Sequence, residues 1–534
     1  MRKAAGPALN RRMMLKVAAL GMTGLAAPAM IGRAAGGRMS WRDGDPFSLG
    51  VASGAPSAGG FTIWTRLAPQ PLSPDGAAGM PPESVPIVYE IATDDGMLGV
   101  IQRGAVSASA SFAHTVHVEV TGLAPGRPYW YRFDCGAAQS RIGRALTLPS
   151  PDSEQDRLRF GFVSCANFEH GYFSAYRHLA DEHPDIVLFL GDYIYEGVGK
   201  AEDTVRRHSD GSEAKTLATY RNRYAQYRCD PDLQRLHAEV PSLITWDDHE
   251  VQNDYAGQWS QTFDDPAQFL LRRAAAYQAF YEHMPLRPGR SQPTGPNMHL
   301  FDRFRFGRLA EFSMVDGRQY RSREACYRPP DKGGGHLETD QSCPERRDLA
   351  RSMIGSQQEA WLLDGLSLSS ARWNVIAQDV LMAQLRQKTA DGDFGYWTDN
   401  WDGYPANRTR LLQHISRSRV RNPVILGGDI HSFWANDLKL DFNHSKSETV
   451  ATELVCTSIA SRGPPYELLS KCLPDNPHVR FFESRYRGYA CADITRAEMT
   501  TRFRVLSDAT NPDATISTLK TFVVEDGIPG AIPS

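Results

Sequence analysis

The chain has 534 residues, of which 41% are hydrophobic and 23% are charged. This composition is ordinary for a globular protein, and it excludes wholesale disorder, a coiled coil, a collagen-like chain and a multi-span membrane protein. The 59 basic and 62 acidic residues give a formal net charge of −3, so we expect no stable electrostatic binding of nucleic acid. A chain of this length predicts two domains.

Residues 1–36 have the features of an export signal. Basic residues come first, a weakly apolar stretch follows over 17–31, and the first acidic residue is Asp43. The stretch is shorter than the roughly 20 residues of a membrane helix. Residues 10–16, NRRMMLK, resemble a twin-arginine signal. We therefore expect a twin-arginine signal peptide, the twin-arginine translocase as partner during export, and a periplasmic or secreted protein. The alternative is a basic N-terminus with a short helix.

Eight cysteines are few for a chain of this length, so the protein is not a disulfide scaffold. No CxxC motif occurs, which argues against a zinc ribbon or a thioredoxin-like site. An oxidising compartment would permit a disulfide bond. By spacing and local polarity, Cys326 and Cys343 are the best candidates to form it.

Two regions of the chain differ in the pattern of their hydrophobic residues. Residues 40–150 contain short alternating strands, such as 61–67 and 85–92, and residues 123–133 resemble the late strands of a fibronectin-type-III-like β-sandwich. After a polar linker, residues 156–525 carry fully apolar strands at 158–164, 185–190, 241–246, 373–377 and 423–426, with a helix at 173–181. Buried strands separated by helices predict an α/β domain.

Four of these apolar strands are followed by polar residues. The segments read CAN at 165–167, GDYIYE at 191–196, DDHE at 247–250 and GDIH at 428–431. In open α/β sheets, ligands bind beyond the carboxyl ends of the strands, so we expect these side chains to converge. Carboxylate, amide and phenolate oxygens suit Fe³⁺, Mn²⁺ or Ca²⁺, whereas a zinc site would use several His or Cys residues. Two adjacent cations would polarise a phosphoryl group and supply hydroxide.

These segments resemble the signature of calcineurin-like metallophosphoesterases. The variants here match PhoD-type alkaline phosphatases: Cys165 at the first position, Asp248 where Asn is usual, and Asp429 where the first His is usual. Residues 316–321, DGRQYR, resemble a further motif of that family, and the resemblance extends over 45–525. It implies an α/β/β/α metallophosphoesterase sandwich after the N-terminal sandwich.

The resemblance also implies the metal ligands. A purple-coloured Fe³⁺ would be held by Cys165, Asp192, Tyr195 and His431. One or two Ca²⁺ ions would lie beside it, with Asp192 bridging. The implied calcium ligands are Asp192, Asp248 and Asp429, with Asn253 or Gln378 as a further donor. Gln378 stands where dinuclear relatives often have a histidine, which weakens the case for a transition metal in the second site.

Three residues are candidates for contact with the substrate. His249, beside Asp248, would donate a proton to the leaving alkoxide. Arg318 would hold two phosphate oxygens, and Asn167 would contact the phosphate. The alternatives are a hydrogen-bonded loop histidine, an ordinary salt-bridged arginine and, for Cys165, a plain buried thiol.

The sequence therefore predicts an exported, monomeric phosphoric ester hydrolase that uses metal-activated hydroxide. Its substrates would be phosphate mono- and diesters of small molecules, lipids or nucleotides. A phospholipase D-like phosphodiesterase is the alternative within this class. A cell-envelope binding protein with structural metals is the alternative outside it.

Overall fold

The computed structural model describes residues 44–328 and 333–534, so the expected signal at 1–36 lies outside the described residues. The described residues form one compact unit. Within the described ranges, no helix has both the length and the apolar character needed to cross a membrane.

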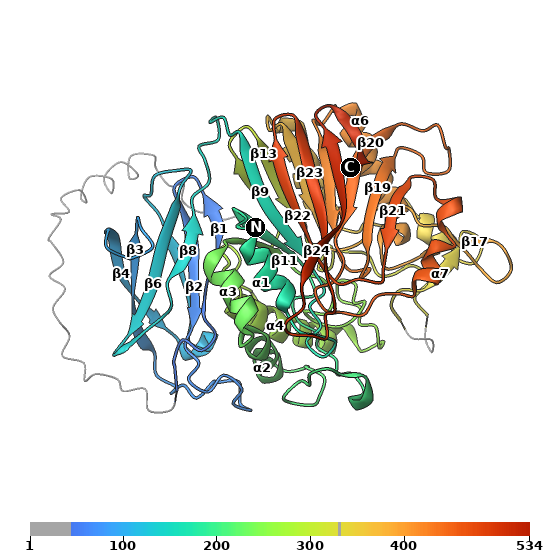
Figure 1. Ribbon diagram of the computed structural model, residues 1–534. Helices are drawn as coiled ribbons and strands as arrows, with labels where there is room; N and C mark the ends of the chain where they lie inside the picture. Colours follow the sequence, from blue (N-terminus) through green and yellow to red (C-terminus); the bar gives the residue numbers. More distant parts are fainter. Residues whose placement is uncertain (1–43, 329–332) are drawn as a thin grey trace, which may run out of the picture. The chain divides into compact units, whose positions relative to one another are not determined.

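Two large sheets form the centre of this unit (Figure 1). The first has ten strands, in the order β25 (Ile528–Pro533), β24 (Ile516–Glu525), β23 (Glu498–Leu506), β22 (Gly488–Thr495), β9 (Arg157–Val163), β10 (Ile186–Leu190), β11 (Ser242–Thr245), β1 (Val51–Ser57), β2 (Gly60–Arg66) and β5 (Thr115–Val120). The second has seven strands, in the order β12 (Asp302–Phe306), β13 (Ala310–Met314), β15 (Trp373–Ala377), β18 (Pro423–Gly427), β20 (Thr449–Val455), β19 (Phe433–Lys439) and β21 (Val479–Glu483).

The two sheets pack face to face through an apolar core. Phe160 and Leu188 of the first sheet belong to the same buried cluster as Phe312, Val375 and Leu426 of the second. The rings of Phe160 and Phe312 meet edge to face, with centroids 5.2 Å apart. β9, β10 and β11 run parallel, as do β13, β15, β18 and β20. β10 and β18 are buried along their whole length between the other sheet and the helices, which is why they read as unbroken hydrophobic runs.

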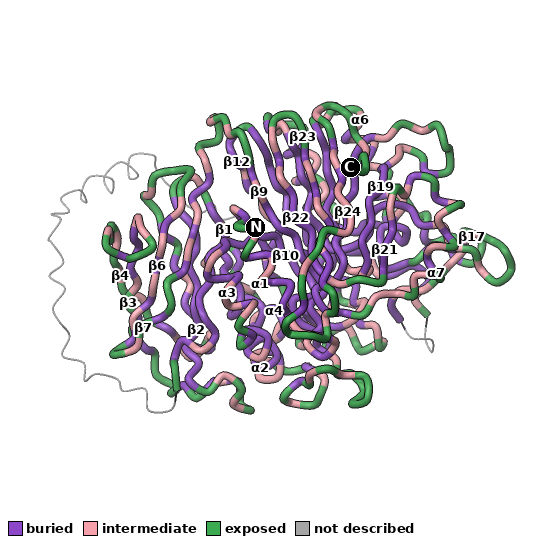
Figure 2. Tube along the Cα trace, in the orientation of Figure 1, coloured by how far each residue is buried: buried purple, intermediate pink, exposed green. Residues whose placement is uncertain are grey.

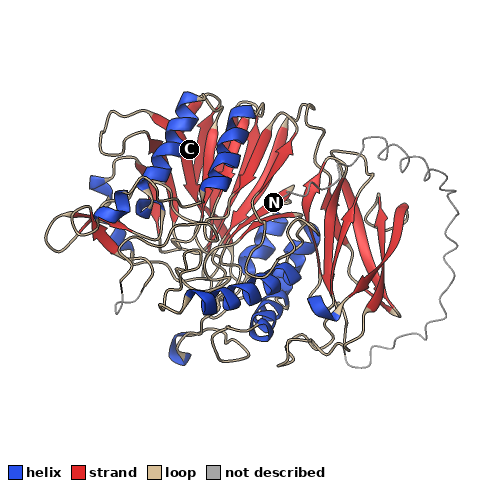
Figure 3. Cartoon of the chain, turned by 180° about the vertical axis from the view of Figure 1, so that it is seen from behind, coloured by secondary structure: helices blue, strands red, loops and turns tan. Residues whose placement is uncertain are grey.

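Helices cover the outer faces of both sheets, as Figure 3 shows in blue. Four helices share a buried cluster with β10 and β11: α1 (Ser174–Asp181), α2 (Leu217–Arg228), α3 (Pro231–Glu239) and α4 (Pro266–His283). Two others, α5 (Ser356–Leu368) and α6 (Pro405–Arg417), share one with β15 and β18. A short helix, α7 (Tyr466–Ser470), follows β20. The layers are therefore helix, sheet, sheet and helix, and the strands are the most continuously buried part (Figure 2).

The N-terminal strands form two antiparallel layers. One layer contains β4 (Val100–Ala108), β3 (Val85–Ala92), β6 (Pro128–Cys135), β7 (Ala138–Gln139) and β8 (Gly143–Leu146). It shares a core with β1, β2 and β5, in which Ile63 and Val118 pack near Ile87 and Tyr131. The second layer also continues into the ten-stranded sheet, because β1 pairs with β11 at Gly54 and Ser242. The sequence did not indicate this continuity.

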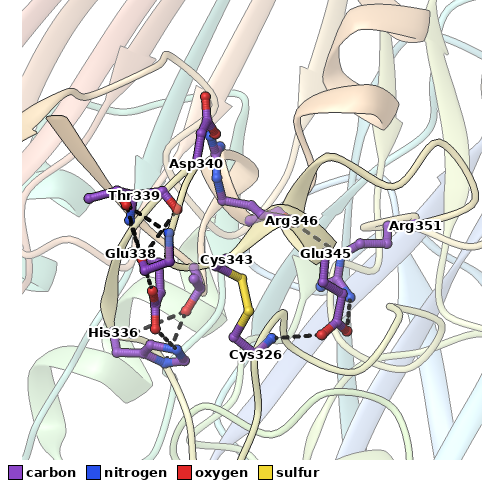
Figure 4. The surroundings of a disulfide bond; sticks show 12 residues. Cys326, His336, Glu338, Thr339, Asp340, Cys343, Glu345, Arg346 and Arg351 are labelled. Carbon is purple, nitrogen blue, oxygen red and sulfur yellow. Dashed lines mark hydrogen bonds and ion pairs between the residues drawn. A yellow bond between two sulfur atoms is a disulfide. The ribbon is translucent and has the colours of Figure 1, made fainter. Parts of the chain in front are cut away.

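A small three-stranded sheet lies beside the disulfide bond. Its strands are β14 (Leu337–Thr339), β17 (Phe394–Trp397) and β16 (Gln387–Lys388). Cys326 and Cys343 are bonded, which confirms the pairing predicted from their spacing. Figure 4 shows this disulfide with Asp340 next to Arg346 and Glu345 next to Arg351. The backbone N–H of Cys326 donates to the Glu345 carboxylate at 3.1 Å.

Candidate metal centre

The loops that follow β9, β10, β11 and β18 meet at one edge of the two sheets. The backbone N–H of Cys165 donates to the carbonyl of Gly191 at 3.2 Å, and that of Ala166 donates to the carbonyl of Asp192 at 2.9 Å. Gly191 has a φ of 99°, and a Cβ there would lie 2.4 Å from the Cβ of Asp247. Only glycine therefore lets the loops after β10 and β11 approach this closely.

Four of the predicted ligands have left-handed backbone conformations. The φ angles are 60° at Cys165, 54° at Asp192, 61° at Asp429 and 51° at His431. This region is uncommon for residues other than glycine, and strained residues of this kind cluster at functional sites. Other residues of the described chain, such as Ala55 and Phe263, also have this conformation, but at these four positions it coincides with the ligands that were predicted from the sequence.

The first group of candidate ligands contains Cys165, Asp192 and His431, whose donor atoms all lie within 4.8 Å of one another. Tyr195 completes the group: its hydroxyl lies 2.7 Å from Oδ2 of Asp192 and 2.9 Å from Nε2 of His431. Nδ1 of His431 lies 2.7 Å from the carbonyl of Arg462, so Nε2 is the nitrogen that faces the group. The structure thus brings together the four residues expected to hold the first metal ion.

Two further groups extend the site. Asp192, Asp248 and His249 form one, and Asp247, Asp248 and Asp429 form the other, each with donor atoms within 4.8 Å. Asp192 belongs both to the group of Cys165 and His431 and to the group of Asp248 and His249. A ligand that bridges two metal ions has to lie in this way between two groups of donors. Asp247 was not among the predicted ligands.

The carboxylates of this site fit a bound cation. Asp192 and Asp248 are only 1% and 2% exposed, and Oδ1 of each has no hydrogen-bond partner in the described part of the chain. Buried carboxylate oxygens without donors are costly unless a cation neutralises them. Burial raises the pKa of Asp248 and of Asp429. Burial would also raise the pKa of Asp192, but His249 and His431 outweigh it and lower that pKa to about 2.

His249 is held at the border of the site by Glu196. Nδ1 of His249 lies 2.6 Å from Oε2 of Glu196, whose other oxygen accepts the backbone N–H of Asn253 at 2.7 Å. The His249 side chain is 19% exposed, and its ring lies 4.1 Å from that of Tyr195. Burial would lower the pKa of His249, but the carboxylates of Glu196, Asp248 and Asp192 raise it well above its usual value. Because Glu196 occupies Nδ1, Nε2 is the atom left to meet a substrate.

Arg318 does not lie where it was predicted to act. Its side chain is fully buried, and Nη1 and Nη2 donate to the carboxylate of Asp399 at 2.7 and 2.8 Å. Nε donates to Asp247. The prediction that Arg318 holds phosphate oxygens is therefore wrong in this geometry, and the salt-bridged alternative is what the structure has. Arg318 compensates the buried carboxylates behind the metal ligands instead.

Gln378 also differs from its prediction. Its amide oxygen accepts the backbone N–H of Val380 and the indole N–H of Trp401, both at 3.1 Å. These two hydrogen bonds use both lone pairs, so this oxygen is not a free metal donor. Oδ1 of Asn167 accepts the backbone N–H of Glu169 at 2.9 Å. The roles given to Asn167 and Asn253 stay predictions.

Two carboxylates that hold other residues of the site in place, Glu250 and Glu196, were not predicted from the sequence. Glu250 accepts backbone N–H groups from Asp192, Tyr193 and Asp247, and so fastens two ligand loops together. Burial and the neighbouring Asp192 raise the pKa of Glu250 to about 8. Glu196 is the second, through its bond to His249. Glu196 is the last residue of the segment 191–196, and Glu250 is the last residue of the segment 247–250. Their position next to predicted ligands is the sequence feature that could have identified them.

Comparison with known proteins decides the family. The sequence profile of the PhoD-like phosphatase family matches residues 160–503, and the profile of the N-terminal domain of these phosphatases matches residues 33–149. The chain belongs to the PhoD-like phosphatase family. The predicted family is thereby confirmed, and with it the class of phosphoric ester hydrolases.

Individual relatives of this PhoD-like phosphatase agree with the assignment. Alkaline phosphatase D of Bacillus subtilis (strain 168) is 42% identical over 488 residues, which cover 90% of this chain and 81% of that protein. A solved structure described as that of PhoD superposes with a TM-score of 0.85 at 41% identity, over 92% of both chains. Purple acid phosphatase 15 of Arabidopsis thaliana is 24% identical over 186 residues, 33% of this chain and 34% of that protein.

Proposed function

We propose that this PhoD-like phosphatase hydrolyses phosphate mono- and diesters at a centre of Fe³⁺ and Ca²⁺. The observation that carries the proposal is the convergence of Cys165, Asp192, Tyr195 and His431 from loops far apart in the sequence. A thiolate, a phenolate, a carboxylate and an imidazole are a donor set suited to Fe³⁺. When bound, such ions polarise a phosphoryl oxygen and make hydroxide available near neutral pH.

For the second position we propose Ca²⁺, held by Asp192, Asp248 and Asp429. The support is the chemistry of the donors, because calcium prefers several hard carboxylate oxygens. The group of Asp247, Asp248 and Asp429 adds a fourth carboxylate at this position. Gln378 is not part of this proposal, because its oxygen is already hydrogen-bonded.

The protein's own contribution to the chemical step is a proton at Nε2 of His249. In the proposed step, hydroxide forms a bond to phosphorus as the bond to the ester oxygen breaks. The leaving oxygen takes the proton from Nε2, while Glu196 keeps Nδ1 bonded and the ring in place. The same proton is needed for monoesters and diesters, so this arrangement favours neither.

Substitution of Asp192 tests the proposal. Asp192→Asn keeps the size of the side chain but removes the bridging charge, so we expect loss of hydrolysis of both p-nitrophenyl phosphate and bis-p-nitrophenyl phosphate, with reduced metal content. Circular dichroism should show an unchanged fold. Asp156→Asn is the control, because its side chain is 99% exposed and it precedes β9, whereas Cys165 follows the other end of that strand. Turnover retained by a folded Asp192→Asn protein would contradict the proposal.

We further propose export by the twin-arginine translocase and a monomeric protein in the periplasm or outside the cell. Support comes from the residue pattern of 1–36 and from the Cys326–Cys343 bond, because disulfides persist in oxidising compartments. Replacing Arg11 and Arg12 by lysine should hold the precursor in the cytoplasm, as measured by cell fractionation. Efficient export of that variant would contradict this proposal.

For the N-terminal layers we propose a fibronectin-type-III-like sandwich. Two antiparallel layers that share one core support it, as do the strands at 128–135 and 143–146. The comparison that tests it is the order of these strands against that of a solved fibronectin-type-III domain.

A further inference from the structure

A cavity lies next to the candidate metal centre, on the side of His431. It has a volume of about 500 Å³, within the range of small-molecule sites. The residues that matter in its lining are His170, Arg462, Tyr466, Arg485, Tyr486 and Arg487. None of them belongs to the ligand groups described above.

Two hydrogen bonds join this cavity to the metal centre. The carbonyl of Arg462 lies 2.7 Å from Nδ1 of His431, and Nη1 of Arg487 donates to the carbonyl of His431 at 2.9 Å. The backbone N–H of Arg462 lies 3.3 Å from Nδ1 of His170, which follows the loop of Cys165. The wall of the cavity therefore shares residues with the support of one predicted metal ligand.

Two half-exposed arginine side chains line the cavity. The Arg462 side chain is 57% exposed, and its nearest carboxylate, that of Asp203, lies 4.0 Å away. The Arg485 side chain is 58% exposed and pairs with Glu483 at 2.6 Å.

Arg487 pairs with backbone carbonyls and with Ser458 rather than with a carboxylate; within the described ranges no acidic side chain lies within 4 Å of it. Asp508 is the acidic residue in the lining, and Thr510 donates to it. The three guanidinium groups are thus matched in number by three carboxylates, those of Glu483, Asp508 and Asp203, but the side chains of Arg462 and Arg485 stay more than half exposed.

We propose that this cavity binds a second phosphate group of the substrate while the first is hydrolysed at the metal centre. The proposal rests on the proposed function, and it adds that the preferred substrates carry two phosphate groups joined by a short linker. Arginine forks match phosphate oxygens in geometry and charge, and exposed arginine side chains are accessible to a phosphate group. Exposed Arg462 and Arg485 are the residues that discriminate between substrates with one and two phosphates.

The experiment compares propyl phosphate with propane-1,3-diyl bisphosphate. The metal-loaded, full-length mature enzyme is assayed for phosphate release, and the readout is the ratio of the two kcat/KM values after correction for the two equivalent phosphates. We expect a ratio of about ten or more in favour of the bisphosphate, equivalent to about 1.4 kcal/mol. The preference should fall as ionic strength rises, because salt screens exposed charges.

The Arg462→Gln/Arg485→Gln double variant should lower this ratio at least fivefold. Arg480→Gln is the matched control, because Arg480 is also about half exposed and paired with a carboxylate, that of Asp437, but lies outside the cavity. It should keep the wild-type ratio. A wild-type ratio near one, or a double variant that keeps the preference, would overturn the second-phosphate site. Hydrolysis of neither compound, nor of the nitrophenyl esters, would instead overturn the proposed function.

Discussion

Glu196 and His249 form a hydrogen-bonded pair beside the metal ligands, with Oε2 of the carboxylate 2.6 Å from Nδ1 of the imidazole. Glu196 sits one residue after Tyr195, and His249 sits one residue after Asp248, so each partner is adjacent in sequence to a predicted ligand. The pair therefore ties the orientation of His249 to the two loops that carry candidate metal ligands.

Glu196→Gln should lower kcat about 10- to 100-fold and leave KM and the metal content close to wild type, because partners that orient a catalytic histidine have effects of this size. Steady-state kinetics with elemental analysis measures this. Glu239→Gln is the matched control, since that side chain is 44% exposed and pairs with Arg235 at the end of α3. Equal losses of metal and of kcat would show that Glu196 supports the metal loops rather than the histidine.

Arg318→Met should lower the free energy of unfolding by about 3–5 kcal/mol, because it leaves Asp247 buried without its cation and leaves Asp399 with Arg321 alone. Chemical denaturation of the folded variant measures the change. Arg318→Lys keeps the charge but not the planar fork, and should lose less stability. If Arg318 contacts phosphate instead, KM would rise in both variants while stability stayed at the wild-type value.

Removing the disulfide bond should also cost stability. The bond closes a loop with a sequence separation of 17, for which the chain-entropy treatment gives about 3 kcal/mol. We expect the Cys326→Ser/Cys343→Ser variant to unfold at a lower denaturant concentration than wild type by a matching amount. Cys229→Ser, at an exposed free cysteine, is the control and should not shift the midpoint. An unshifted midpoint in the double variant would show that the loop is held by its other contacts, such as that of Arg346 with Asp340.

The elements that the sequence predicted well are strands with a clear local pattern, either apolar throughout or alternating between apolar and polar residues. The strands at 85–92 and 373–377 have the predicted bounds, and those at 158–164 and 185–190 differ by one residue at their ends. β22 to β25 were not predicted. The partner of β22 is β9, more than 300 residues earlier in the chain, and such antiparallel pairing over long distances leaves no local signal. The joining of β1 to β11 is a tertiary contact without a local signal.

The residues of the candidate site also differ in how well the sequence predicted their surroundings. The segments that contain Cys165, Asp192, Tyr195 and His431 could be located because each follows an apolar strand, and parallel strands end at a common edge. The resemblance to metallophosphoesterases then implied these four residues as ligands. Arg318 and Gln378 also follow such strands, but their partners come from elsewhere: Asp399 for the first, Val380 and Trp401 for the second. Whether a polar side chain faces a metal or a buried neighbour depends on packing that one sequence does not reveal.

The most direct test of the central claim is the metal content and visible spectrum of the purified protein, measured without adding metal, for wild type and Tyr195→Phe. We predict about one iron per wild-type chain with a strong visible band, and a weaker or shifted band in Tyr195→Phe with the iron retained by the other three ligands. Tyr486→Phe, at an exposed tyrosine, should keep the wild-type spectrum. A colourless, iron-free wild-type protein that still hydrolyses phosphate esters would contradict the account.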